Sequence, residues 1–359
     1  MNVLHVFISL TEDMLYYERI LKLNSYFPQY IISCDKQDLP NSKFSNFFRT
    51  KYFNFPKIEF LKNYFYTKES IACYRKNLSN VKFDLIHSYF AYPCASAGQQ
   101  LAEKLEVPHI VTVRGSDVLV YPKQSKYLNA KITQNLKKAN LVICVSKHLM
   151  RVCMEMGVDE KKLIHLPDGH NTNYFFIDPK VKKENYILFA GNLISVKNPL
   201  KLISAFKIIS KNQPNLLLKI AGSGALQAEM QKMTLDKGIE NNVIFLGQIS
   251  QKELGIQMQK AKLLVLPSLS EGWGNVLQES LACGTPVVAS AVGGIPEIIS
   301  EGENGFFCNP HSEQDIAEKI LKALNYPWDN AKLALMPSFY TREIIIEKTL
   351  QIYQNIISK

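Results

Sequence analysis

Short apolar runs alternate with helical patterns along the whole chain. Apolar runs bounded by turn residues are typical of buried strands, and apolar residues three and four positions apart are typical of helices. The predicted strands are 3–9, 30–33, 83–89, 109–114, 141–146 and 163–167 in the first half, and 186–191, 216–221, 243–247, 263–267, 286–291 and 305–308 in the second. Helical patterns lie between them, for example at 199–210, 225–237, 251–260 and 312–325. Two sets of β-α repeats predict two doubly wound α/β domains with parallel sheets.

A change in pattern divides the chain. Residues 167–185 are polar and rich in turn residues, so we place a boundary there, with predicted domains at 1–170 and 171–340. A C-terminal segment, 341–359, follows a break that contains proline and carries a last helical pattern at 341–357. This helix is long enough to pack back on the first domain, although its pattern also allows packing on the second.

Composition indicates a globular protein with more than one core. A chain of 359 residues with 47% hydrophobic residues is long enough for two domains that each bury most of their apolar surface. No run of about eighteen apolar residues occurs, and the N-terminus lacks the basic start and cleavage site of a secretion signal. The seven cysteines are scattered without a C-x-x-C pair, which is typical of reduced core thiols. We therefore expect a cytoplasmic protein.

The formal net charge of +10 is concentrated in the first half. Residues 1–170 hold 23 Lys and Arg against 15 Asp and Glu, whereas residues 171–359 hold 19 against 17. A run that interleaves aromatic and basic residues lies in the first half at 47–68. Such a run can lie on an anionic membrane, bind single-stranded nucleic acid by stacking, or form an irregular core edge with solvated lysines. Of the two binding hypotheses we prefer the membrane surface, and we expect no nucleic-acid partner.

Two carboxylates flank a predicted helix start in the second half. Glu271 follows the predicted strand 263–267, and Glu279 lies on a helix that begins after Gly274. A helix N-terminus presents unpaired N–H groups and a partial positive charge, so the backbone at 274–276 is suited to hold a phosphate. Carboxylates beside it can accept hydrogen bonds from sugar hydroxyls. The arrangement suits a nucleotide sugar, and the alternative is a plain β-α-β unit with solvent-facing glutamates.

A lysine and two further loops are expected at the same sheet edge. Lys197 lies six residues after Gly191, which ends a predicted strand, and two residues before a helix start. A cation there can neutralise a diphosphate, although a solvated loop lysine has the same pattern. Gly222 and Gln248 follow the next two strands, and ligands of open α/β sheets bind beyond the carboxyl ends of strands. Gly222 alone is weak evidence, because a glycine there can simply turn the chain.

The region around the two glutamates resembles a known family. Glu271 and Glu279 have seven residues between them, Gly272 and Gly274 follow the first, and the run GGIPE lies downstream at 293–297. These residues are similar to the E-x7-E region of retaining, family 4-type glycosyltransferases of GT-B fold. The resemblance covers nearly the whole chain and is most specific in the second half. It implies an α/β protein of two Rossmann-like doubly wound domains facing a cleft, with the C-terminal helix crossing back to the first domain.

The resemblance also implies a function. A retaining glycosyltransferase moves a sugar from a nucleoside-diphosphate sugar, held by the C-terminal domain, to an acceptor hydroxyl at the N-terminal domain. The implied acceptor is a glycan or a lipid-linked precursor of a bacterial surface polysaccharide such as capsule, exopolysaccharide, O-antigen or teichuronic-type polymer. Such an enzyme works in the cytoplasm or peripherally on the inner face of the membrane. The chain has no Asp-x-Asp, H-E-x-x-H or Cys/His cluster, so we expect neither a metal nor another cofactor.

The resemblance implies a role for each residue that matches a position of the family's motifs. The catalytic candidates are Lys197, Glu271, Asp117 and Arg114. The donor-binding candidates are Gly191, Asn192, Gly222, Gln248, Ile249, Gly272, Gly274, Asn275, Val276 and Glu279, and the loop with Gln248 and Ile249 is expected at the nucleobase. The acceptor-side candidates are His87, Tyr89 and Gly115. Read from the residues alone, Arg114 and Asp117 also fit a local ion pair, and His87 also fits a core histidine.

Two positions depart from the family pattern. Asn192 stands where the family usually has arginine, which leaves Lys197 to neutralise more of the diphosphate charge. The loop 9–14 contains no glycine, whereas the family often has a glycine-rich loop there, bordering the acceptor. An alternative function is therefore an inactive sugar-nucleotide-binding or scaffold protein of the same fold. A nicotinamide oxidoreductase is a more distant alternative, since no G-x-G-x-x-G follows the first strand.

Overall fold

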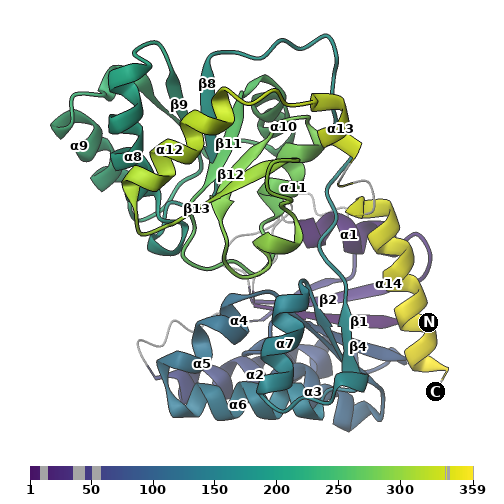
Figure 1. Cartoon of the computed structure of the whole chain (residues 1–359). Helices are drawn as coiled ribbons and strands as arrows, with labels where there is room; N and C mark the ends of the chain where they lie inside the picture. Colours follow the sequence, from purple (N-terminus) through teal and green to yellow (C-terminus); the bar gives the residue numbers. More distant parts are fainter. Residues whose placement is uncertain (9–14, 35–44, 51–57, 336, 338–339, 359) are drawn as a thin grey trace. The chain divides into compact units, whose positions relative to one another are not determined.

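The computed structural model describes residues 1–8, 15–34, 45–50, 58–335, 337 and 340–358. The chain forms two compact units (Figure 1). The first unit consists of Met1–Pro167 together with Glu343–Lys359, and the second consists of Asp168–Arg342. The chain therefore passes from the first unit to the second after Pro167 and returns after Arg342, within three residues of the boundaries expected from the sequence.

The first unit contains a seven-stranded sheet in the order β3-β2-β1-β4-β5-β6-β7, and all strand pairs are parallel. Its strands are β1 (Val3–Phe7), β2 (Gln29–Ser33), β3 (Phe47–Arg49), β4 (Leu85–Tyr89), β5 (His109–Val113), β6 (Leu141–Cys144) and β7 (Leu163–His165). Its helices are α1 (Leu15–Leu23), α2 (Glu59–Asn77), α3 (Cys94–Leu105), α4 (Ser116–Leu119), α5 (Tyr121–Gln124), α6 (Lys126–Lys138), α7 (Lys147–Glu155), the short η1 (Glu160–Lys162) and the C-terminal α14 (Arg342–Ile357).

The second unit contains a six-stranded parallel sheet in the order β10-β9-β8-β11-β12-β13. Its strands are β8 (Tyr186–Ala190), β9 (Leu217–Ala221), β10 (Val243–Gly247), β11 (Leu263–Leu266), β12 (Val287–Ser290) and β13 (Gly305–Cys308). Its helical segments are η2 (Ser195–Lys197), α8 (Pro199–Asn212), α9 (Gln227–Asp236), η3 (Glu240–Asn242), α10 (Gln251–Lys260), α11 (Asn275–Ala282), η4 (Ile295–Glu297), α12 (Glu313–Leu324) and α13 (Asn330–Leu335).

The prediction of two parallel α/β sheets is confirmed, and the central strands of both sheets are buried along their whole length, as expected when helices cover both faces. Strand β3 was not among the predicted strands. It lies, together with the start of helix α2, in the aromatic and basic run at 47–68, where charges interrupt the apolar pattern. The part of that run at 51–57, and the glycine-free loop at 9–14, lie outside the described residues. Among the described helices, none is long and apolar enough to cross a membrane.

The C-terminal helix belongs to the core of the first unit, so its predicted return to that domain is confirmed (Figure 1). Ile345, Ile346 and Tyr353 of α14 are buried in one cluster with residues of β1, β4 and β5. The Tyr353 hydroxyl is also hydrogen-bonded to Nδ1 of His87 on β4, at 2.6 Å. The seven cysteines are all buried and free, as predicted.

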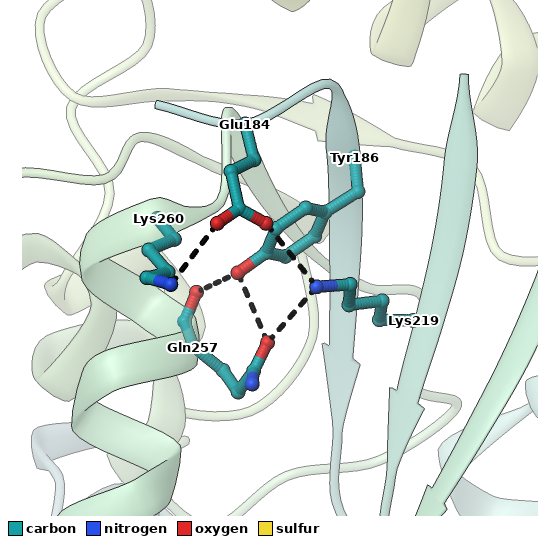
Figure 2. A network of polar contacts seen from close by, with 5 residues as sticks. All are labelled: Glu184, Tyr186, Lys219, Gln257 and Lys260. Atoms are coloured by element: carbon teal, nitrogen blue, oxygen red, sulfur yellow. Dashed lines mark hydrogen bonds and ion pairs between the residues drawn. The ribbon is translucent and has the colours of Figure 1, made fainter. Parts of the chain in front are cut away.

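A polar network fixes the start of the second sheet (Figure 2). Lys219 on β9 lies 3.8 Å from the ring centroid of Tyr186 on β8 and 3.4 Å from the carboxylate of Glu184. Lys260, at the end of α10, lies 3.0 Å from the other oxygen of Glu184, and the Tyr186 hydroxyl donates to the carbonyl of Gln257 at 2.7 Å. These contacts tie β8, β9 and α10 together at the amino ends of the strands, away from the loops that follow them.

Three histidines are buried in adjacent strands of the first sheet. His5, His87 and His109 lie on β1, β4 and β5, where His5 is hydrogen-bonded to Gln29 at 2.6 Å and His109 to Ser88 at 2.8 Å. Burial lowers the pKa of His5 to about 4 and the pKa of His109 to about 3. Burial also lowers the pKa of His87 well below its usual value. All three imidazoles are therefore neutral in the folded protein at pH 7.

We predict that these rings make the protein sensitive to acid. A group whose pKa is lowered by folding contributes stability at neutral pH, and that stability is lost as the pH falls from about 6.5 toward the folded pKa. For His109 the loss between pH 7 and pH 5 is roughly 2 kcal/mol. Urea denaturation should therefore show a smaller drop in unfolding free energy for His109→Gln than for the wild type. His311→Gln, at an exposed position, is the control, and an equal drop in all three proteins would contradict the prediction.

Candidate active site

A lysine and a glutamate meet at the point where the second sheet changes direction. Strands β8 and β11 are neighbours, but the chain continues from β8 toward β9 and from β11 toward β12, so the loops that follow them diverge. Lys197 follows β8, Glu271 follows β11, and Lys197 Nζ lies 2.5 Å from Glu271 Oε1. Ser268 Oγ donates to the same oxygen at 2.8 Å. The Glu271 side chain is only 8% exposed and that of Lys197 24% exposed, so the pair is largely shielded from water.

The backbone on both sides of this pair is held by Asn198. This residue has a positive φ of 55° and precedes the first residue of α8. Its side-chain amide donates to the carbonyl of Pro267 at 3.1 Å and to that of Pro310 at 2.7 Å. The N–H of Leu269 donates to the carbonyl of Val196 at 2.8 Å. These bonds tie the loop with Lys197 to the loop with Glu271. The sequence analysis did not identify this role of Asn198, although an Asn before Pro at a helix start could have indicated it.

Two glycines let the loops approach one another closely. Gly222 has a φ of 140°, and a Cβ there would lie 2.0 Å from the carbonyl oxygen of Gly191. Gly293 has a φ of 58°, and a Cβ there would lie 1.7 Å from the carbonyl oxygen of Glu271. The N–H of Gly222 also donates to the carbonyl of Gly247 at 2.7 Å. The loops after β8, β9 and β10 therefore lie in one row at the carboxyl edge of the sheet, as the sequence predicted.

Helix α11 starts shortly after Glu271 in the chain. Gly274, with a φ of 98°, precedes the helix without a side-chain cap, so the first N–H groups of α11 have no intrahelical acceptor. Glu279 is buried one turn into the helix. Burial, and then the charge of Asp168, raise the pKa of Glu279 from 4.5 to about 8. Asn275 Nδ2 donates to Asp168 Oδ2 at 3.3 Å. Asp168 is thus a further acidic residue near this helix, and the sequence predictions did not include it.

Gln278 anchors α11 to the segments at the ends of the second unit. Its amide nitrogen donates to the carbonyl of Tyr340 at 2.8 Å and is hydrogen-bonded to His170 Nδ1 at 3.1 Å. Its amide oxygen accepts from Trp273 Nε1 at 3.0 Å. Gln278, Glu279 and Ser280 are buried in succession on this helix, so the local sequence pattern does not single out Gln278 as the anchor.

The other donor-side candidates lie on the same loops. Asn192 is exposed in the loop after β8, Gln248 is exposed after the edge strand β10, and Ile249 beside it is half-buried. Gly272 is buried next to Glu271, and Val276 is half-buried in the first turn of α11. Among the described residues, no group of three or more His, Cys, Asp or Glu side chains could hold a metal ion. The expected independence from metal remains a prediction.

In the first unit, Asp117 ties two loops together. Its buried carboxylate accepts hydrogen bonds from the N–H of Ala91 at 3.0 Å, of Arg114 at 3.0 Å and of Gly115 at 2.9 Å. Burial raises the pKa of Asp117, and these backbone bonds oppose that rise. The guanidinium of Arg114 lies 4.0 Å from the ring centroid of Tyr16. Asp117 therefore positions the loops after β4 and β5, and a direct contact of Asp117 or Arg114 with a substrate remains a prediction.

His87 and Tyr89, expected on the acceptor side, lie in the core of the first unit. Both side chains are buried on β4. His87 uses Nδ1 for Tyr353 and Nε2 for Thr112, the latter at 2.7 Å, while the Tyr89 ring stacks on Phe7 at 4.1 Å between centroids. The core-histidine alternative fits His87, because both ring nitrogens are engaged within the protein. We therefore leave both residues out of the acceptor site proposed below.

The organisation of the two units defines the class of the protein. Two Rossmann-like units with parallel sheets are the GT-B architecture of glycosyltransferases. Residues 171–338 match the family Glycosyl transferases group 1, and residues 30–174 match Glycosyltransferase Family 4. The chain therefore belongs to the group 1 glycosyltransferases, and the predicted family is confirmed.

Individual proteins support the same assignment. Over 244 residues, 67% of this chain, it is 34% identical to an uncharacterised glycosyltransferase of Methanocaldococcus jannaschii, and the match spans 66% of that relative. Sucrose-phosphate synthase from Thermosynechococcus elongatus has a similar structure, with a TM-score of 0.82 over 99% of both chains and 20% identity. Anabaena HepE, solved in complex with UDP and glucose, gives a TM-score of 0.78 over 99% of this chain and all of its own, with 17% identity. At these identities the two solved structures show the shared fold.

We predict that Glu279 lowers the stability of the free protein as the pH rises. Because folding raises its pKa from 4.5 to about 8, its contribution to the unfolding free energy is greatest below pH 4.5 and falls until about pH 8. Glutamine mimics the protonated acid, so Glu279→Gln should gain stability relative to the wild type as the pH rises from 5 to 8. Urea denaturation at both pH values measures the difference. Glu318→Gln, at an exposed position on α12, is the control, and a difference that does not change with pH would refute the assignment.

Proposed function

We propose that this protein transfers a sugar from a nucleoside-diphosphate sugar, held by the second unit, to an acceptor hydroxyl with retention of anomeric configuration. The observation that carries this proposal is the shielded pair of Lys197 and Glu271 at the β8/β11 switch point, followed in the chain by the uncapped start of α11. A cation and helix N–H groups suit a diphosphate, and carboxylates suit the hydroxyls of a sugar and a ribose.

In the proposed reaction the bond from the anomeric carbon to the diphosphate breaks while the acceptor oxygen bonds to the same face of that carbon. Negative charge grows on the leaving phosphate, where Lys197 and the N–H groups at 275–276 would stabilise it. The leaving phosphate oxygen takes the proton of the acceptor hydroxyl, so the atoms and charges balance without a separate base. Glu271, which accepts a hydrogen bond from Ser268, would hold the Lys197 ammonium in position before the donor arrives.

The ribose and the base are proposed to lie along the same sheet edge. Glu279, with its buried carboxyl group beside Asn275 and Asp168, would bind ribose hydroxyls. The exposed loop at Gln248 and Ile249 would contact the base. Because HepE shares the fold and was solved with UDP and glucose, UDP-sugars are the first donors to test. The exposed Asn192 would contribute hydrogen bonds but no charge to the diphosphate.

We also propose that the acceptor is a glycan or lipid-linked precursor at an anionic membrane surface. Helix α2 presents an exposed strip in which Phe60 is 58% and Tyr64 51% exposed, and Lys68 continues this strip one turn later. Aromatic rings at the membrane interface and lysines on lipid phosphates stabilise such docking, and the first half of the chain carries a charge surplus of eight (23 against 15). Lys51 and Lys57 of the same run lie outside the described residues.

We predict that Lys197→Ala slows transfer about 10- to 100-fold, mainly in kcat. A charge-assisted hydrogen bond to the diphosphate contributes roughly 1.5 to 3 kcal/mol, and the charge develops in the transition state. Glu279→Ala should instead raise the donor KM through lost ribose contacts. Lys201→Ala, a nearby lysine on α8 that pairs with Glu313, is the matched control. The measurement is steady-state kinetics with the sugar nucleotide that the enzyme turns over. Wild-type values of kcat and donor KM in both Lys197→Ala and Glu279→Ala would refute the site.

We predict that transfer needs no added divalent metal. Lys197 and helix N–H groups take the electrostatic role that a metal plays in other transferases. Activity should therefore survive extensive dialysis against EDTA. A tenfold or larger loss that Mn²⁺ or Mg²⁺ restores would show that the reaction depends on a metal.

We predict that binding to vesicles requires anionic lipid and weakens steeply as the salt concentration rises. Lys68→Ala should reduce vesicle binding about fivefold, since a basic residue near an anionic surface contributes about 1 kcal/mol. The double variant Phe60→Ser and Tyr64→Ser should reduce vesicle binding further. Leu235→Ser, at a 63% exposed position in the second unit, is the matched control in a sedimentation assay. Equal binding to neutral and anionic vesicles would exclude the membrane proposal and leave the transferase proposal standing.

A further inference from the structure

The first unit contains a cavity at its own switch point. Strands β1 and β4 are neighbours, and the chain continues from β1 toward β2 and from β4 toward β5. A cavity of about 340 Å³ lies at the carboxyl ends of these strands. Ile8 directly follows β1, Cys34 follows β2 and Phe90 follows β4, and all three line it. In open α/β sheets this is the position where ligands bind, and the volume falls in the usual range for small-molecule sites.

The walls of the cavity are mostly apolar. Its described lining consists of Ile8, Cys34, Glu59, Lys62, Phe65, Tyr66, Phe90, Tyr92, Pro93, Tyr121, Gln124 and Leu128. Two of the tyrosine hydroxyls are already bound to the backbone: Tyr66 donates to the carbonyl of Phe7 at 2.7 Å, and Tyr92 to the carbonyl of Glu59 at 2.5 Å. A free sugar needs a polar partner for most of its hydroxyls, because an unpaired buried hydroxyl is costly. This lining suits a hydrocarbon better than a free sugar.

One cation lies at the border between the cavity and solvent. Lys62 lines the cavity, its side chain is 41% exposed, and its ammonium lies 2.9 Å from the carboxylate of Glu59. A partly exposed ammonium can exchange such a partner for a phosphate, because exposed ion pairs are weak. The cavity therefore combines apolar walls with the ion pair of Lys62 and Glu59, and a bound phosphate would have to replace Glu59 as the partner of the ammonium.

The exposed strip of α2 adjoins this cavity. Phe60 and Tyr64 are exposed on the same helix that contributes Phe65 and Tyr66 to the cavity wall. The Phe60 ring also packs edge-on against Tyr127 at 5.9 Å, and the next residue, Leu128, lines the cavity. A lipid that reaches the protein at the proposed membrane-facing strip would thus arrive about one helical turn from the cavity.

We propose that this cavity binds the hydrocarbon chain of a lipid-phosphate acceptor, with the phosphate paired to Lys62. The inference rests on the proposed transferase function and deepens it, because it names the chemical class of the acceptor as a lipid phosphate. Tyr121 and Phe90 connect this site to the loops that Asp117 ties together, so an occupied cavity would border the predicted acceptor side of the first unit.

Calorimetric titration with farnesyl phosphate, below its aggregation limit and without vesicles, tests this proposal. Two controls are titrated in the same way: farnesol, which has the hydrocarbon chain without the phosphate, and inorganic phosphate, which has no hydrocarbon chain. We expect farnesyl phosphate to bind at least tenfold more tightly than either part. Lys62→Ala should weaken farnesyl phosphate binding five- to tenfold and leave farnesol binding unchanged. Lys76→Ala, at an exposed lysine on the same helix that does not line the cavity, is the matched control and should bind as the wild type does.

A second variant tests the cavity itself. Gln124 lines it and is exposed, so Gln124→Trp fills space without disturbing the core and should weaken both farnesyl phosphate and farnesol at least fivefold. Wild-type binding by Gln124→Trp, or tight binding of inorganic phosphate alone, would overturn the proposal. UDP is titrated into every variant in parallel and should bind equally to all. Intact UDP binding without farnesyl phosphate binding would reject the lipid site alone, whereas failure of UDP binding would count against the donor site.

Discussion

The ion pair between Lys197 and Glu271 determines how the loops of the second unit are arranged. A carboxylate that is only 8% exposed is costly unless a cation and hydrogen bonds compensate for the lost water. Lys197 and Ser268 supply both at the same oxygen. The lysine in turn depends on Asn198, whose left-handed backbone and two side-chain hydrogen bonds bring the end of one loop to the start of the next. The close contacts at Gly222 and Gly293 exist because these loops lie so near one another.

The fixed positions of these charges also explain why such a site suits a diphosphate. The charges are in position before the ligand arrives, so little reorganisation is needed when negative charge grows on a leaving group. The uncapped start of α11 adds N–H groups to this arrangement, and Gln278 holds that helix by bonds to Tyr340 and His170. The first unit also has a cavity at its switch point, but the described lining of this cavity is mostly apolar and its charged members are Lys62 and Glu59.

Much of the fold followed from the sequence, because buried parallel strands are continuous apolar runs and their loops must share one edge. The spacing of Lys197, Glu271 and Glu279 relative to those strands was enough to bring them to the same side of the second sheet. Contacts between distant segments could not be predicted in this way. Asp168 lies near Glu279 only because the linker folds against α11, and nothing in the local pattern of either residue indicates it. The sequence left His87 open between the acceptor side and the core for the same reason, since its partner Tyr353 is supplied by the C-terminal helix.

Lys197 and Glu271 are proposed to act as one unit on the donor, and a double-mutant cycle measures whether they do. The measurement is kcat/KM for the sugar nucleotide that turns over, in the wild type, Lys197→Ala, Glu271→Gln and the double variant. Residues that act as a unit give strongly non-additive losses. We expect the double variant to lose little more than Lys197→Ala alone. Losses that simply multiply would contradict it, because they would mean that the two side chains contribute independently.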